Sequence, residues 1–125
     1  MPEQFQDGSY EIVGCAMRVH NELGFGLREK PYENALAIEL ELSGFEAEQQ
    51  RKFPIVYRDR LVGDCIPDIT VDAPRRLLIE VKAVERIGDS ERAQVLNYLR
   101  ITGFRLGLIL NFGTAKLDWK RVILG

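Results

Sequence analysis

The sequence predicts a mixed α/β protein in which helices flank a central mixed β-sheet. Two amphipathic helical stretches come first, at residues 9–23 and about 31–43, and several short extended runs follow them. The chain then passes from an apolar strand at 77–81 through a helix to a second apolar strand at 104–112. This strand–helix–strand order is typical of a crossover between parallel strands, so we expect a mixed sheet covered by helices.

The first predicted helix covers residues 9–23. Ser9 or Asp7 can cap its amino end, and Gly24 ends it. Its apolar stripe consists of Val13, Ala16, Met17 and His20. His20 therefore lies on the inward face, where it is either a hydrogen-bonded core residue or a support for a nearby site.

The second predicted helix begins near Pro31, because proline suits the first turn of a helix, and Gly44 ends it. Its helical spacing turns Glu33 partly inward. Glu29 is either a first-turn acid that complements the positive end of the helix dipole or a ligand. The apolar positions are Tyr32, Ala35, Leu36, Leu40 and Leu42.

Extended chain follows from 45 to 57, where Pro54 indicates an edge strand or the start of a strand. Residues 58–60 are typical of a hairpin turn. Two further strand-like runs, beginning at Ile66 and Leu77, are joined by the turn signal Asp72-Ala73-Pro74. Asp89 or Ser90 can cap the third helix, whose buried stripe is Val95, Leu96 and Leu99. Residues 120–124 form a short final strand or a tail.

Length and composition are those of one globular domain, which we expect to span residues 1–125. Hydrophobic residues make up 46% of the chain and charged residues 29%, which is ordinary for folded domains. No apolar run approaches the roughly 20 residues of a membrane span, and residues 1–10 lack the apolar segment of a signal peptide. Cys15 and Cys65 form no CxxC motif. We therefore expect a cytoplasmic protein with no membrane segment.

Charge and histidine content exclude several classes of site. The formal net charge is −2, whereas domains that hold nucleic acid by their overall charge are usually basic. A local basic patch beside an acidic site is compatible with that value. His20 is the single histidine, which excludes an HExxH motif, a Cys2His2 finger and a three-histidine zinc site.

Three ionisable residues interrupt the apolar strand pair. Glu80 and Lys82 are two apart on the second strand and therefore share one face of the sheet, and Asp68 interrupts the first strand. A carboxylate in a low-dielectric interior costs several kcal/mol unless it is paired or binds a cation. We therefore favour a metal site with a helper lysine. The structural alternative makes Asp68 a turn cap and Glu80 and Lys82 an ion pair on an edge strand.

Gln94 and Tyr98 lie one turn apart on the shoulder of the third helix. They can act together at a site. The alternative is a surface amide beside a packed ring.

The motifs resemble those of a known nuclease group. Pro67-Asp68 followed by Glu80-Val81-Lys82 is similar to the core of the PD-(D/E)XK nuclease superfamily. The stretch Gly26–Tyr32 resembles the GxxExxY signature of a family within it. Further matching stretches lie at 19–24, 32–36, 93–99 and 107–113, so that the resemblance covers about residues 10 to 124.

The resemblance implies a role for each matching residue. Asp68 and Glu80 would be metal-binding carboxylates and Lys82 the catalytic lysine. Glu33 matches a helix glutamate that often completes the metal shell, and the main-chain carbonyl of Val81 would be a further ligand. Such a site of hard oxygen ligands suits Mg²⁺ or Mn²⁺. Supporting residues would be Glu29, Tyr32, Gln94, Tyr98 and His20.

The function that the resemblance implies is metal-dependent hydrolysis of phosphodiester bonds. The partner would be nucleic acid, with DNA favoured over RNA, including the branched or damaged ends of repair and recombination. The alternative is a catalytically silent member of the fold that serves as a binding or assembly module. A homodimer fits either function, because one domain of this size offers little surface to hold a duplex.

Overall fold

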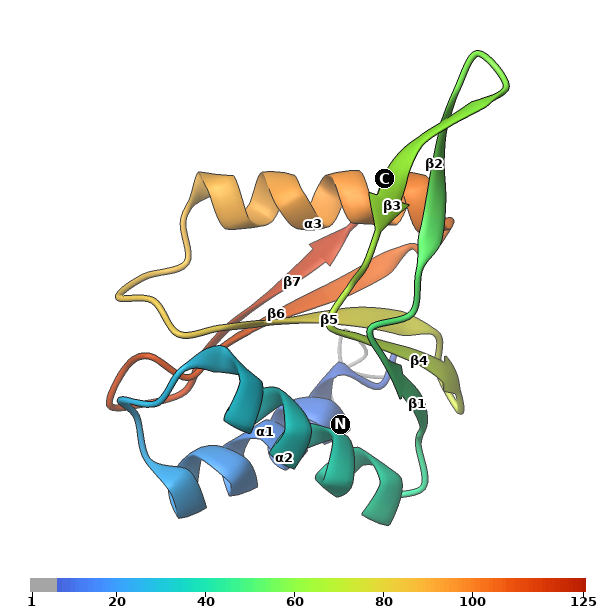
Figure 1. Cartoon of the computed structure of the whole chain (residues 1–125). Coiled ribbons are helices and arrows are strands. Elements are labelled where there is room, and N and C mark those ends of the chain that lie inside the picture. The colour runs from blue at the N-terminus through green and yellow to red at the C-terminus, as the bar shows by residue number, and fades with distance from the viewer. Residues whose placement is uncertain (1–6) are drawn as a thin grey trace.

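The computed structural model describes residues 7–125. The expectation that the amino terminus contains no signal peptide falls partly on residues 1–6, which lie outside the described residues. In the described part, no helix has the length and apolar character needed to cross a bilayer. Two helices come first (Figure 1): α1 (Ser9–Leu23) and α2 (Glu29–Leu42). Then follow β1 (Glu46–Gln49), β2 (Phe53–Tyr57), β3 (Arg60–Cys65), β4 (Ile69–Ala73), β5 (Leu77–Lys82), α3 (Asp89–Thr102), β6 (Leu106–Asn111) and β7 (Asp118–Ile123).

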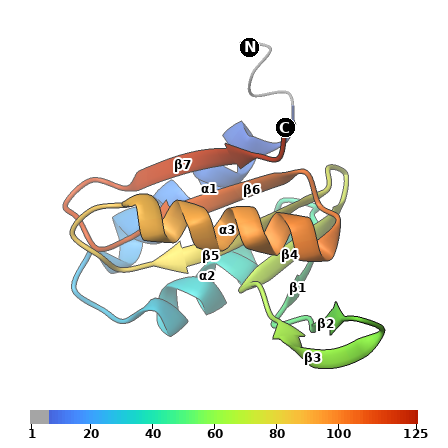
Figure 2. The same cartoon turned by 90° about the horizontal axis from the view of Figure 1, so that it is seen from above.

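The main sheet has five strands in the order β1-β4-β5-β6-β7. The β5 and β6 strands are parallel, and the other neighbouring pairs are antiparallel. The α3 helix connects β5 to β6 and covers one face of the sheet, while α1 and α2 cover the other (Figures 1 and 2). The expected mixed sheet flanked by helices is therefore confirmed.

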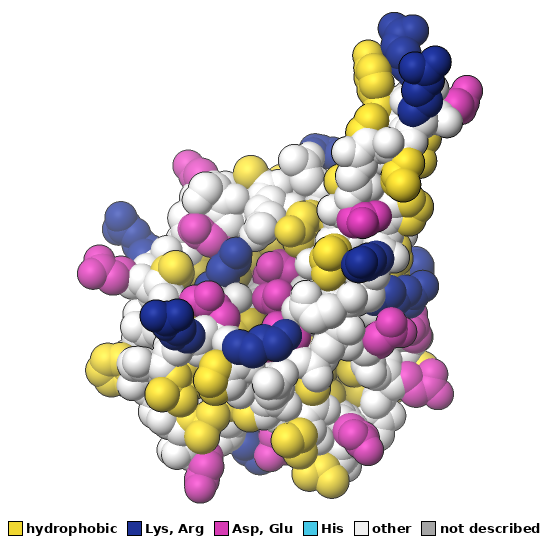
Figure 3. Space-filling view, in the orientation of Figure 1, with side chains coloured by type: hydrophobic (Ala, Val, Ile, Leu, Met, Phe, Trp, Pro, Cys, Tyr) yellow, Lys and Arg dark blue, Asp and Glu magenta, His cyan; other side chains and the backbone are white. Residues whose placement is uncertain are grey.

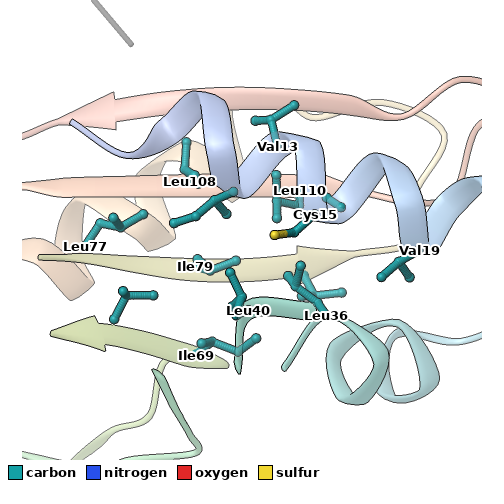
Figure 4. Close-up of a cluster of buried hydrophobic side chains, with 14 of the residues drawn as sticks. Val13, Cys15, Val19, Leu36, Leu40, Ile69, Leu77, Ile79, Leu108 and Leu110 are labelled. Carbon is teal, nitrogen blue, oxygen red and sulfur yellow. The ribbon is translucent and has the colours of Figure 1, made fainter. Parts of the chain in front are cut away.

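The larger core lies between the sheet and the α1–α2 pair, where aliphatic side chains from both layers interlock (Figure 4). Leu36 and Leu40 of α2 are fully buried against it, as is Ile79 of β5. Two expected core positions are wrong, because Met17 and Leu42 are 46% and 77% exposed. The inward positions of α1 include Ile12, Cys15 and Val19 instead.

A smaller core lies under α3. Val95 and Leu99 are fully buried there, whereas Leu96 is only half-buried. The helix approaches β6 closely at Gly107, where an added Cβ atom would lie 2.6 Å from Cγ1 of Val95. Neither Asp89 nor Ser90 caps this helix. Gly88 is the N-cap residue, and its N–H donates to the Glu91 carboxylate over 2.6 Å.

Several strand boundaries differ from the expected ones. The β4 strand begins at Ile69 rather than Ile66, so Asp68 lies immediately before it. Asp72 and Ala73 belong to β4, and the chain turns over 74–76. The last strand is also longer than expected, because β7 pairs with β6 from Asp118 onward.

The β2 and β3 strands form a separate two-stranded sheet that projects from the body of the molecule (Figures 1 and 2). Its turn is Arg58-Asp59, flanked by the paired residues Tyr57 and Arg60. Pro54 lies in this small sheet, which agrees with an edge position. The β2 strand of the hairpin follows β1 in the chain, and the β3 strand leads directly to Asp68.

Candidate functional site

The site begins where the β4–β5 ladder ends. The last ladder pair on this side is Ile69 with Ile79, and beyond it side chains replace the backbone pairing. The Asp68 N–H donates to Oε1 of Glu80 over 2.8 Å. In return, the N–H of Val81 donates to Oδ2 of Asp68 over 2.8 Å. Asp68 and Glu80 are thus fixed side by side at adjacent strand ends.

Burial makes these two carboxyl groups difficult to ionise. Glu80 is 4% exposed, and burial, reinforced by the charge of Asp68, raises its pKa to about 8. Burial also raises the pKa of Asp68, and the charge of Glu33 adds to that effect. The same shielded region raises the pKa of Cys65 to about 11, again through burial and then through the charge of Glu80. A region that opposes negative charge in this way favours either protons or a bound cation.

Lys82 follows on the same face of β5 and is held by α3. Its Nζ donates to Oε1 of Gln94 over 2.8 Å, and Nε2 of Gln94 donates to the Tyr98 hydroxyl over 3.2 Å. Within residues 7–125 no ion pair joins Glu80 to Lys82. The structure therefore does not contain the ion pair that was the structural alternative. Gln94 and Tyr98 do lie together, as their spacing predicts. They continue the series of hydrogen bonds that begins at Lys82.

Glu33 approaches the site from α2 and is 3% exposed. A glutamine that the sequence reasoning missed lies between it and Asp68. The Nε2 of Gln50 is 3.1 Å from each oxygen of Glu33 and 3.5 Å from Oδ1 of Asp68. Gln49 and Lys30 also donate to Glu33, over 2.7 and 3.3 Å. Neutral and positive donors thus surround the Glu33 carboxylate.

Gln50 has an unusual backbone, with φ at 58°. Non-glycine residues with positive φ are uncommon and often occur at functional sites. The adjacent pair Gln49-Gln50 within the extended stretch 45–57 was the visible signal in the sequence. The left-handed backbone that aims Gln50 at two acids has no sequence signature.

The remaining predicted support residues lie elsewhere. His20 is buried on α1 and donates from Nε2 to the Thr114 carbonyl over 2.8 Å. Tyr32 is fully buried, donates to the Gly24 carbonyl over 2.7 Å, and stacks on Phe112 at 4.6 Å between ring centroids. Glu29 is exposed at the start of α2. His20 and Tyr32 therefore hold loops together, and neither hydrogen-bonds to the carboxylates.

Asn111, at the end of β6, fixes the loop that follows Lys82. It is fully buried, and its amide exchanges two hydrogen bonds of 2.9 Å with the backbone of Val84. The N–H of Gly113 also donates to its Oδ1 over 3.0 Å. A Cβ at Gly113 would lie 2.5 Å from the Val84 nitrogen, so this approach requires glycine. The position of Lys82 is thus set from β6 as well as from α3.

Comparison with known proteins identifies the family. The PD-(D/E)XK nuclease superfamily model matches residues 6–122. The chain belongs to the PD-(D/E)XK nuclease superfamily. No curated protein matches the sequence. A solved structure, that of SSO0001, is similar with a TM-score of 0.56 and 13% identity, over 96% of this chain and 60% of that chain.

The likeness to SSO0001 extends to the fold alone at that identity, and the present chain spans 60% of its length. Together with the five-stranded mixed sheet and its flanking helices, the family match is consistent with a restriction-endonuclease-like fold. The two residue groups that resemble the motif in the superfamily's name are Pro67-Asp68 and Glu80-Val81-Lys82. In this PD-(D/E)XK domain they lie at adjacent strand ends.

PD-(D/E)XK nucleases generally use divalent metals, and the donors here agree with that use in kind. Asp68 and Glu80 supply hard carboxylate oxygens, and Val81 adds a main-chain carbonyl nearby. Among residues 7–125, however, no three histidine, cysteine or acidic side chains are grouped closely enough to hold an ion. Glu33 is the acid that would complete such a group, and the Gln50 amide lies between it and Asp68.

The surface view agrees with this arrangement. Acidic side chains gather in a hollow at the centre of the face seen in Figure 3, between α3 and α2, with Lys and Arg side chains around them. An acidic centre with a basic surround suits a cation and an anionic ligand together.

Proposed function

We propose that this PD-(D/E)XK domain is a metal-dependent nuclease that hydrolyses phosphodiester bonds of DNA. One observation carries the proposal. Two carboxylates that resist ionisation lie side by side, and a lysine on the same strand face is paired with a neutral amide rather than with either acid. A structural ion pair would neutralise the lysine. Here its charge remains available to a phosphate.

Each residue has a distinct role in the proposal. Asp68, Glu80 and the Val81 carbonyl would hold Mg²⁺ or Mn²⁺, and the ion would supply polarisation of the phosphate and a lower pKa for a bound water. The Lys82 ammonium orients the attacking water and stabilises negative charge that develops on the phosphate. Gln94, itself held by Tyr98, keeps Lys82 from folding back onto Glu80. Glu33 would be a further metal ligand in place of its hydrogen bonds with the Gln50 amide.

The finer assignment follows the sequence resemblance. The GxxExxY signature at 26–32 supports membership of that family, and the substrates to consider first are branched or damaged DNA ends of repair and recombination. RNA is a second substrate class. A homodimer would supply surface that one small domain lacks.

The direct test is a cleavage assay with linear, nicked, branched and single-stranded DNA and with RNA, each with Mg²⁺, with Mn²⁺ and with EDTA. Metal-dependent cleavage of any substrate by the wild type, lost in Asp68→Asn, is the expected result. The matched control is Glu41→Gln, an exposed acid on α2 far from the strand ends. Equal cleavage by Asp68→Asn and the control would contradict the proposal.

A catalytically silent binding module is the second candidate, and one observation favours it. In the part of the chain that the structure describes, the acids are not grouped for metal binding, and amide donors from Gln49 and Gln50 satisfy Glu33. A wild-type protein that neither binds Mn²⁺ nor cleaves any substrate would favour this second function over the first.

A further inference from the structure

The β2–β3 arm, defined here as residues 51–64, differs in charge from the rest of the protein. It contains four basic residues and two acidic ones, for a net charge of +2, whereas the whole chain carries −2. Two of the basic residues, Arg58 and Arg60, lie at the projecting tip (Figure 3). Neither forms an ion pair with any described residue. The tip, which also contains Asp59, therefore presents a net positive charge to solvent.

The tip also has a costly conformation. Its turn residues, Arg58 and Asp59, both have positive φ, at 49° and 63°. Two-residue hairpin turns with this backbone strongly favour Asn-Gly. An arginine is unfavourable at the first position, yet its guanidinium is held over the Tyr57 ring at 5.6 Å and donates to the Tyr57 hydroxyl over 3.2 Å. An unfavourable residue held in place at an exposed tip points to a use for its charge.

The flanks of the arm are unusually apolar for an exposed ribbon. Val56, Leu61 and Val62 are between 58% and 68% exposed, and Tyr57 is 62% exposed. Such a two-stranded ribbon has the width that the major groove of duplex DNA admits, where apolar side chains contact base edges and thymine methyl groups. Basic tips and apolar flanks together are the chemistry of a ribbon that enters a groove and contacts phosphates on both sides.

The arm is joined to the candidate site at both ends. Gln50, which contacts Glu33 and Asp68, precedes it, and β3 leads through Pro67 to Asp68. The eight residues from Arg60 to Asp68 reach at most about 25 Å at the rise of a strand. That reach corresponds to roughly seven base pairs of B-form duplex.

We propose that the β2–β3 arm binds the groove of duplex nucleic acid at a distance from the bond placed at Asp68 and Glu80, with Arg58 and Arg60 on the phosphates. The inference rests on the proposed function in taking nucleic acid as the ligand. It adds that the ligand is double-stranded beside the reacting bond. The binding energy comes from outside the acidic centre, which resolves how a chain of net charge −2 holds a polyanion.

The test is fluorescence anisotropy with a labelled DNA duplex of about two helical turns, in EDTA so that cleavage plays no part. The variant is Arg58→Asn with Arg60→Gln. Loss of two phosphate contacts should weaken binding about tenfold and lower the slope of log affinity against log salt by about 1.8. The variant should melt at the wild-type temperature or above it, because asparagine suits the turn backbone.

The control is Arg75→Gln with Arg105→Gln, which removes the same charge from two exposed residues outside the arm, one in the turn between β4 and β5 and one just before β6. It should bind as the wild type does. Equal binding by the two double variants, or no binding of duplex by the wild type at low salt, overturns the inference. So does a wild-type dimer that Leu61→Ser dissociates with no change in duplex affinity, because the arm would then be a contact between copies.

The two proposals fail separately. If duplex binding depends on the arm but no substrate is cleaved in Mg²⁺, hydrolysis is wrong and the arm inference holds. If the arm variant binds and cleaves as the wild type does, hydrolysis holds and the arm inference is wrong.

Discussion

Asp68 and Glu80 fix one another by reciprocal hydrogen bonds at the point where the ladder between their strands ends. The backbone N–H of Asp68 donates to the Glu80 carboxylate, and the Asp68 carboxylate accepts from the residue after Glu80, each over 2.8 Å. Each carboxyl group thereby commits one oxygen to the backbone. Two acids are thereby held side by side, although burial raises the pKa of both.

Asp68→Asn should separate metal binding from folding. The amide oxygen can still accept from the Val81 N–H, so the strand end keeps its geometry, and the unfavourable burial of a charge disappears. We expect the metal-free variant to melt at the wild-type temperature or higher. Calorimetry should find Mn²⁺ binding at least about tenfold weaker than in the wild type, since changes to outer partners alone cost about 10–100-fold. Unchanged Mn²⁺ binding would remove Asp68 from the site.

Stability without metal should fall as the pH rises. The pKa of Glu80 is about 8 in the folded protein and 4.5 in its ordinary state. Between those values the folded protein keeps a proton that the unfolded chain has lost, so unfolding releases a proton. The free energy of unfolding should therefore decrease from about pH 4.5 to pH 8, by up to about 1.4 kcal/mol per pH unit.

Thermal melts in EDTA across that range measure the effect, and Glu80→Gln supplies the comparison because it has no proton to lose. The amide oxygen of the substituted side chain can still accept from the Asp68 N–H. We expect the profile of this variant to be flatter than that of the wild type. Parallel profiles for the two proteins would show that Glu80 ionises normally. In the wild type, Mn²⁺ binding at pH 7 should also release a proton, which calorimetry in two buffers of different ionisation enthalpy detects.

Lys82→Ala should lower activity far more than stability. The hydrogen-bond partner of Lys82 is the half-buried Gln94. Water can replace Lys82 as the donor to this amide, so no buried carboxylate is left without a partner. Removal of one preorganised charge-stabilising group typically costs about 10²–10³ in rate. We expect hydrolysis to fall at least a hundredfold and the melting temperature in Mg²⁺ to change little. Lys116→Ala, an exposed lysine elsewhere, is the control.

The opposite result has a clear meaning. Had Lys82 been the structural partner of Glu80, its loss would cost roughly 3–5 kcal/mol. A strongly destabilised Lys82→Ala, together with a wild type that cleaves nothing, would support the silent module.

Gln94→Ala and Tyr98→Phe should act on substrate handling through Lys82. Both side chains are half-buried, and neither belongs to the buried stripe of α3. We expect reduced kcat with near-normal stability, and a larger effect for Gln94→Ala because it removes the direct contact. Leu99→Ala is the comparison for core damage, at about 2–5 kcal/mol. If Gln94→Ala loses as much stability as Leu99→Ala, the pair is structural.

The sequence predicted the fold well because its signals are local. Helical spacing, the apolar strands at 77–81 and 104–112, and the crossover order suffice to predict the sheet and its helices. The prediction that Met17 and Leu42 belong to the core was wrong, because an apolar residue at the border of a stripe can face either the core or solvent. That Asp68 lies before β4 rather than within it depends on where the ladder ends, which is a property of the assembled sheet.

The site was predicted less completely, for a physical reason. Asp68, Glu80 and Lys82 interrupt apolar runs and are therefore visible in the sequence. Gln50 and Asn111 are not visible in this way. Gln50 nevertheless lies between Glu33 and Asp68, and Asn111 fixes the loop after Lys82. A neutral amide in a sequence shows neither the carboxylates nor the backbone groups it will meet, because those come from distant segments.

The close approach of α3 to β6 has a consequence for Lys82. Gly107 lets Val95 rest almost on the sheet backbone, and the residue before Val95 is Gln94. The clearance between helix and sheet therefore determines whether an amide on α3 can span the gap to an ammonium group on β5. The added methyl group of alanine at position 107 would push α3 away from the sheet or force the Val95 side chain to rotate. The substitution would thereby lengthen the hydrogen bond between Lys82 and Gln94 without altering either side chain.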